Sequence, residues 1–148
     1  MDIQNVFQRY EIKYMISKEQ QERILRGMET YMEGDAYGRS TICNLYFDTD
    51  NYLLIRRSLE HPVYKEKLRL RSYGTAKPDS QVFMELKKKY QSVVYKRRIG
   101  ITEREAMRCL RGEESLMDTQ IGREMDYFLR QYQYPRPAVF LSYEREAF

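Results

Sequence analysis

The sequence predicts an α+β fold in which an antiparallel β-sheet has helices packed on its outer side. Several stretches alternate apolar and polar side chains with a period of two, and the connections between the central ones are short, which favours antiparallel neighbours. Other stretches show helical periodicity and begin with capping residues. A chain of 148 residues, with 42% hydrophobic and 32% charged residues, fits one domain with its own core.

The strand pattern is clearest where apolar and charged residues alternate. In the first such stretch Tyr10, Ile12, Tyr14 and Ile16 would share one face. Later stretches alternate Lys and Arg with Leu, Val or Met. We therefore expect about six strands, over residues 7–16, 39–49, 65–73, 81–89, 92–99 and 138–145.

Helix starts fall between these strands. Ser17 and Gln20 form a capping-box pattern, and Thr102 and Glu105 repeat it. A third helix should begin near Thr119 and end before two prolines, Pro135 and Pro137. The apolar positions expected to pack are Ile24, Leu25, Met28 and Tyr31 in the first helix, Ala106, Met107 and Leu110 in the second, and Ile121, Met125, Phe128, Leu129 and Tyr132 in the third.

Positive charge is concentrated in the middle of the chain. The net charge is +4, but residues 65–98 contain eleven Lys or Arg and three acids, which gives +8 in that segment. Strand parity places most of these cations, with others from the first strand, on one face. This predicted basic face consists of Arg9, Lys13, Lys65, Lys67, Arg69, Arg71, Lys87, Lys89, Lys96 and Arg98, with Glu11 and Glu85 among them.

Two interpretations of this face are open. A single strand that alternates Lys and Leu usually has one solvated face. A solvated face normally mixes signs, however, because like charges directly opposite one another destabilise a sheet. The same positive pattern recurs in several strands here, so we favour a face whose charge is balanced by a bound polyanion. If the sheet curls into a barrel, these cations would line a tunnel.

Other site chemistries find little support. The sequence has no G-x-x-x-x-G-K-[ST] and no G-x-G-x-x-G motif. His61 precedes a proline in a connection, where we expect a surface loop, and we expect Cys43 and Cys109 to be reduced. Asp48 and Asp50 are expected to serve a turn and to cap a short helix over residues 51–57, rather than to bind a metal.

Glu11 and Glu85 leave two alternatives open. A carboxylate among cations can form internal salt bridges, or it can help hold a divalent ion that bridges phosphate oxygens. The chain contains no apolar run long enough to span a bilayer and no secretion signal at its start, so we expect a cytoplasmic protein.

Six motifs in order resemble a known family over nearly the whole chain. They are RYEIKY (9–14), NLYFDT (44–49), YKEKLRLRSYG (64–74), FMELKKKY (83–90), VVYKRRI (93–99) and LSYEREAF (141–148). Together they resemble the VTC-type polyphosphate polymerase domain, one of the triphosphate tunnel metalloenzymes and a relative of CYTH phosphatases. The resemblance implies a tunnel that binds triphosphate or polyphosphate, with Mn²⁺ or Mg²⁺ as cofactor. It also implies transfer of the γ-phosphate of ATP onto a polyphosphate chain, and it allows a membrane-protein partner.

The resemblance assigns phosphate-binding roles residue by residue. They fall on Lys13, Arg57, Arg69, Arg71, Lys87, Lys96, Arg98, Tyr143 and Arg145. Glu85 and Glu11 are the weaker assignments as metal ligands, and no catalytic residue is assigned. The family pattern continues beyond Phe148 with further strands and a basic helix, so we expect residues 1–148 to be one tunnel domain without those elements.

Two other functions compete with polymerase activity. One is an inorganic or organic triphosphatase with the same fold. The other is a polyanion- or nucleic-acid-binding module without activity, since aromatic residues interleave with the cations. Most of these aromatic residues have the wrong parity or lie at strand ends, which makes nucleic acid the least favoured partner.

Overall fold

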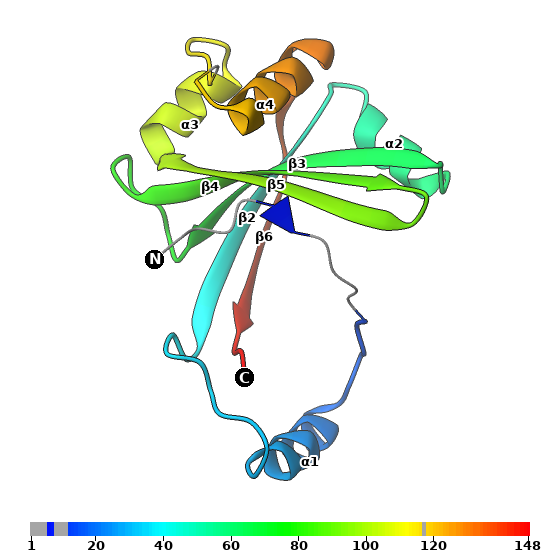
Figure 1. Cartoon of the computed structure of the whole chain (residues 1–148), viewed down its shortest axis with the longest axis vertical. Coiled ribbons are helices and arrows are strands. Elements are labelled where there is room, and N and C mark those ends of the chain that lie inside the picture. Colours follow the sequence, from blue (N-terminus) through cyan, green and yellow to red (C-terminus); the bar gives the residue numbers. More distant parts are fainter. Residues whose placement is uncertain (1–5, 8–11, 117) are drawn as a thin grey trace.

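The computed structural model describes residues 6–7, 12–116 and 118–148 and confirms the α+β fold (Figure 1). Its framework is an antiparallel six-stranded sheet in the order β1-β5-β4-β3-β2-β6. The strands are β1 (Val6–Phe7), β2 (Ser40–Asp48), β3 (Tyr64–Tyr73), β4 (Gln81–Tyr90), β5 (Val93–Thr102) and β6 (Arg136–Arg145). Among the described residues β1 and β6 form the two edges and do not pair with each other, so this sheet is open.

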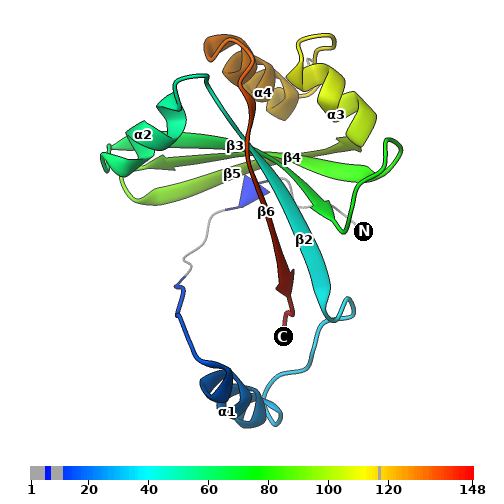
Figure 2. The ribbon, with the colours of Figure 1, turned by 180° about the vertical axis from the view of Figure 1, so that it is seen from behind.

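Four helices accompany the sheet among the described residues: α1 (Lys18–Met28), α2 (Leu53–Leu59), α3 (Glu103–Leu110) and α4 (Gln120–Gln131). The predicted capping boxes of Ser17 with Gln20 and of Thr102 with Glu105 are both present, and Thr119 caps α4. Helices α3 and α4 lie together over one face of the sheet, as Figures 1 and 2 show from opposite sides.

The core lies between this face and the two helices. Leu68 and Leu70 of β3 alternate with basic residues, and their side chains are buried. The residues of the core cluster are Phe47, Leu54, Leu68, Leu70, Val82, Met84, Leu86, Ala106, Cys109, Leu110, Met125, Phe128 and Leu129. Burial of these side chains contributes about 25 cal/mol of free energy per Å² of apolar area removed from water. This contribution holds α3 and α4 on the sheet.

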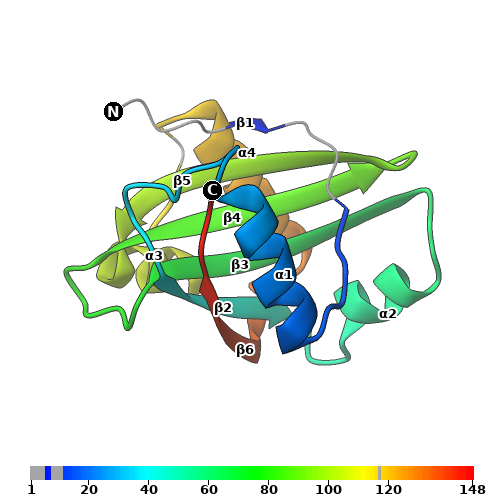
Figure 3. The same cartoon turned by 90° about the horizontal axis from the view of Figure 1, so that it is seen from below.

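The strand register directs the cations to the opposite face. Lys67 of β3 is paired with Lys87 of β4, and Lys87 is in turn paired with Lys96 of β5. Figure 1 shows β2 and β6 running steeply away from β3–β5 on this side, and Figure 3 views the sheet from there. The cations therefore lie on the face of β3–β5 that is opposite to α3 and α4.

The predicted first strand is wrong over most of the part that the structure describes. In the structure, β1 contains Val6 and Phe7, which pair with β5. Residues 8–11 lie outside the described part of the chain. Residues 12–16 have no regular structure, and the Ile12 side chain is 75% exposed. Alternation alone cannot make a strand, because the strand also needs a neighbour to hydrogen-bond and a core to face.

Two other expectations need correction. The short helix begins at Leu53 rather than at residue 51, and its free N–H groups are capped by Asp48 rather than by Asp50. The Asp48 carboxylate accepts hydrogen bonds from the backbone N–H groups of Leu54 (2.9 Å) and Ile55 (3.1 Å). The α1 stripe is also not buried: α1 contains no buried residue, and Ile24 is 48% exposed.

Candidate functional site: the cationic face of the sheet

The cationic face is the face of β3–β5 opposite to α3 and α4, and it corresponds to the basic face predicted from the sequence. The buried carboxylate of Glu85, in β4, lies at its centre and contacts several of its cations. One of its oxygens, Oε2, accepts a hydrogen bond from Arg69 Nε at 2.5 Å. The other, Oε1, lies 2.6 Å from Arg98 Nη2 and 2.9 Å from Lys96 Nζ. Arg71 Nε is 3.9 Å from Oε2. Strands β3 and β5, on either side of β4, thus direct four cations at one carboxylate.

The electrostatics of this cluster are unbalanced. Burial alone would raise the pKa of Glu85, but the charges of Arg69, Arg71 and Lys96 lower it to about 2. Burial lowers the pKa of Lys96 to about 8; Glu85 opposes this shift, and Arg98 and Arg71 add to it. Glu85 is therefore firmly ionised, while burial and two neighbouring arginines disfavour the charged form of Lys96. An anion bound at this face would favour that charged form.

A second set of contacts links the cluster to β2 and β6. Arg71, which is buried, donates from Nε to Asn44 Oδ1 at 3.0 Å and from Nη2 to the Tyr143 hydroxyl at 3.3 Å. Arg69 donates from Nη1 to the Tyr46 hydroxyl at 3.1 Å. These polar partners orient the guanidinium groups of Arg69 and Arg71 before any ligand binds.

Further cations surround this cluster. They lie on the same face by strand parity, and Lys87 is exposed. The residues are Lys65, Lys67, Lys87 and Lys89. The cationic face of β3, β4 and β5 thus carries eight Lys or Arg residues and one acid, Glu85. That ratio makes the face a strong anion attractor.

Most of the phosphate-binding residues assigned by the resemblance converge here. Arg69, Arg71, Lys87, Lys96 and Arg98 occupy adjacent strands of one face. Tyr143 joins them through its hydrogen bond with Arg71. The phosphate-binding roles of these residues stay predictions.

The other assigned residues lie apart from the cluster. Lys13 is in the exposed segment before α1, and Arg145 is exposed at the end of β6. Burial raises the pKa of the Tyr132 hydroxyl, and the nearby Arg57 of α2 opposes this rise. The hydroxyl donates a hydrogen bond to Glu66 at 2.6 Å. Glu66 has the opposite strand parity to the cationic face, so Arg57 is directed elsewhere. Glu11, like Arg9, lies outside the described residues.

The described residues do not fit a protein-bound Mn²⁺ or Mg²⁺. Among them no three His, Cys, Asp or Glu side chains cluster in a way that could hold a metal. Both oxygens of Glu85 already accept from cations, which would repel a divalent ion. The salt-bridge alternative for Glu85 is the one that this geometry favours, and metal ligation by Glu85 stays a prediction.

Sequence reasoning assigned no role to three residues that complete the face. Asn44 and Tyr46 alternate with Leu45 in β2, and Asn44 is buried against Arg71. Phe83 lies under Arg98, with the guanidinium carbon 4.5 Å from the ring centroid. The signal for Asn44 in the sequence was a polar residue between apolar neighbours in a predicted strand, because such a residue needs a hydrogen-bond partner when it is buried. Strand parity placed Phe83 on the same face as Glu85 and Lys87 but gave it no role there.

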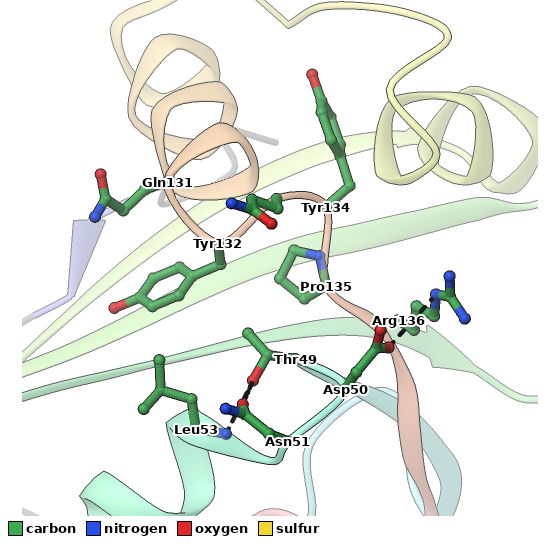
Figure 4. Close-up of a pocket in the computed structure, with 10 residues that line it drawn as sticks. Thr49, Asp50, Asn51, Leu53, Gln131, Tyr132, Tyr134, Pro135 and Arg136 are labelled. Carbon is green, nitrogen blue, oxygen red and sulfur yellow. Dashed lines mark hydrogen bonds and ion pairs between the residues drawn. The ribbon is translucent and has the colours of Figure 1, made fainter.

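A cavity of about 470 Å³ lies where α2 begins and α4 turns into β6 (Figure 4). Thr49 bonds Asn51 there, and Asp50 pairs with Arg136 at 3.6 Å. Apart from Arg136, its lining contains no Lys or Arg. It is therefore a poor match for a polyanion, and we assign it no role.

Comparison with known proteins agrees with this geometry. A Bacillus halodurans protein described as a candidate adenylate cyclase has a similar structure, with a TM-score of 0.57 at 20% sequence identity. The match covers 97% of this chain and 65% of that protein, so the chain spans about two thirds of its length. The likeness shows that the two proteins share a fold.

The model of the VTC domain matches residues 8–148, and the chain therefore belongs to the VTC-domain family. A comparison with curated proteins gave no match. Among the described residues, no helix is both long and apolar enough to cross a membrane.

Proposed function

We propose that the cationic face binds the triphosphate of ATP and a polyphosphate chain, and that the chain serves ATP-dependent polyphosphate synthesis. The observation that supports this best is the Glu85 cluster, in which four cations share one carboxylate. Successive phosphates have the spacing and charge to satisfy the remaining guanidinium and ammonium donors. Membership of the VTC-domain family supports the same substrate class.

In the proposed reaction the bond between the γ-phosphorus and the oxygen that bridges to the β-phosphorus breaks. A terminal oxygen of the polyphosphate forms the new bond to that phosphorus, and ADP leaves with the bridging oxygen. The side chains would act by positioning the two anions and by stabilising charge on the transferred phosphoryl group. Arg69, Arg71 and Arg98 would supply fixed donors, and Lys96 would gain its full charge when phosphate binds.

Mn²⁺ or Mg²⁺, which the family resemblance implies, stays part of the proposal as a cofactor. Since the described residues offer no ligand set, we assign it no step. ATP and polyphosphate are the proposed partners, together with the membrane-protein partner that the resemblance allows.

The proposal is tested by following the products of ATP incubated with the protein and Mn²⁺ or Mg²⁺. Growth of polyphosphate on a gel, matched by release of ADP, would support it. Release of free phosphate without polymer would identify a triphosphatase. Failure of millimolar tripolyphosphate to raise the melting temperature would contradict phosphate binding itself, since a ligand of the native state must stabilise it.

A further inference from the structure

An apolar cavity of about 290 Å³ opens between α2, β2 and β6, at one end of the cationic face. Its lining is mostly aliphatic and aromatic. The residues are Tyr46, Phe47, Asp48, Tyr52, Leu54, Ile55, Lys67, Ala138, Val139 and Leu141. This volume is at the lower end of the range for small-molecule sites, so it suits one planar ring rather than a whole nucleotide.

The cavity is continuous with the cationic face. Lys67 belongs to both, and the Tyr46 hydroxyl, at the cavity wall, accepts a hydrogen bond from Arg69 at 3.1 Å. The Arg69 guanidinium carbon is 5.9 Å from the centroid of the same Tyr46 ring. A ligand could therefore place phosphates against Arg69 and Lys67 while an attached apolar ring enters the cavity.

The cavity offers flat and aliphatic surface but few open polar groups. Tyr52 is 58% exposed, and Val139 and Leu141 are each 49% exposed, so all three can still be covered by a ligand. The Asp48 carboxylate already accepts from the backbone N–H groups of Leu54 and Ile55. It is thus engaged in capping α2 rather than open to read the edge of a ring.

We infer that this cavity is the subsite for the base of a nucleoside triphosphate whose phosphates lie on the cationic face. The inference rests on the proposed function and adds to it the position and recognition of the base. Stacking against Tyr52 or Tyr46 needs only the π-face that every base has. Since stacking does not distinguish one purine from another, adenine and guanine should bind with nearly equal affinity.

The test compares three probes by calorimetry: ATP, methyl triphosphate and tripolyphosphate. Methyl triphosphate has an esterified triphosphate like that of ATP but no base. ATP should bind about tenfold more tightly than methyl triphosphate, and GTP should match ATP. Tyr52→Asn removes the ring and tolerates the left-handed backbone of this position (φ 56°). This variant should bind ATP as weakly as methyl triphosphate and leave tripolyphosphate binding unchanged.

A control and a second variant make the result decisive. Tyr127→Asn removes an exposed ring (70%) from α4 and should change none of the affinities. Val139→Ser, on the opposite wall of the cavity, should reproduce the effect of Tyr52→Asn if that variant fails to fold. Equal affinity for ATP and methyl triphosphate in the natural sequence would overturn the base subsite alone. Failure of all three probes to bind would overturn the proposed function as well.

Discussion

Strands β3–β5 and strand β6 belong to the same sheet, yet they hold their side chains in different ways. In β3 and β4 one face is packed under α3 and α4, and the charges of the other converge on buried Glu85. Every residue of β6 is exposed, including Phe140 at 64%. The central strands thus supply most of the stability that the sheet has of its own, while β6 contributes mainly backbone pairing and part of the candidate site.

The largest expected effect is at Glu85. Glu85→Gln leaves four cations together without their carboxylate, and breaking a buried ion pair in this way costs about 3–5 kcal/mol. The variant should therefore unfold at much lower urea concentration. If it folds, tripolyphosphate should raise its melting temperature more than that of the natural protein, because the bound anion restores the missing charge.

Glu124→Gln is the matched control for this comparison. Glu124 also pairs with an arginine and a lysine, Arg97 at 3.2 Å and Lys88 at 3.6 Å, but its side chain is 24% exposed. Loss of such a partly exposed pair should cost about 1 kcal/mol or less. Equal losses in the two variants would show that burial does not set the strength of the Glu85 cluster.

A pair of leucines sharpens the contrast between centre and edge. Leu86 of β4 is fully buried, whereas Leu141 of β6 is 49% exposed. Leu86→Ala should lower the free energy of unfolding by about 2–5 kcal/mol, because it leaves a cavity under the helices. Leu141→Ala should lower it by about 1 kcal/mol or less. Urea denaturation of both variants measures the difference, and similar losses would contradict the assignment of the core to the central strands.

The shifted pKa of Lys96 predicts a pH dependence of anion binding. In the free protein Lys96 loses its proton near pH 8, below its ordinary value of 10.5. Bound phosphate favours the charged amine, so affinity for tripolyphosphate should fall as pH rises from about 7 to 9. Folding responds in the opposite sense: the unfolded chain binds this proton more tightly, so the contribution of Lys96 to stability rises between pH 8 and 10.5.

Calorimetry at several pH values, with proton uptake measured in buffers of different ionisation enthalpy, tests this expectation. Lys96→Met should bind tripolyphosphate more weakly at neutral pH and lose most of the pH dependence. An unchanged pH profile in this variant would assign the titration to another group.

The smallest effect is expected in α1. Ile24 is 48% exposed, and α1 contains no buried residue, so Ile24→Ser should change the free energy of unfolding by less than about 0.5 kcal/mol. A loss of several kcal/mol would show that the α1 stripe is covered in solution.

The comparison also explains which features could be predicted from the sequence. The central strands and the capped helices were predictable, because alternation and capping are local signals that agree with the packing there. The strand expected over residues 7–16 and the buried face of α1 were not, because a pattern cannot say whether a neighbour is present to pack against. The same reasoning placed Arg69, Arg71, Lys87 and Lys96 on one face correctly.

Distances within the face were beyond sequence reasoning. Strand parity could not decide whether Glu85 forms salt bridges or binds a metal, because both roles place its carboxylate at the same position among cations. Nor could it show that Arg57, on α2, is directed towards Tyr132. The cavity beside Tyr52 depends on a left-handed residue at the start of α2, which the sequence does not mark.

Two neighbouring lysines of β4 provide a test of polyphosphate binding by the cationic face. Lys87 belongs to the cationic face, where it lies opposite Lys67 of β3 and Lys96 of β5 in the strand register. Lys88 belongs to the other face of the sheet and forms an ion pair with Glu124. We expect Lys87→Gln to weaken tripolyphosphate binding about tenfold, the value of one charge-assisted hydrogen bond, and Lys88→Gln to change it less than twofold. Equal effects of the two substitutions on the calorimetric Kd, or an effect confined to Lys88→Gln, would contradict the assignment of polyphosphate to this face.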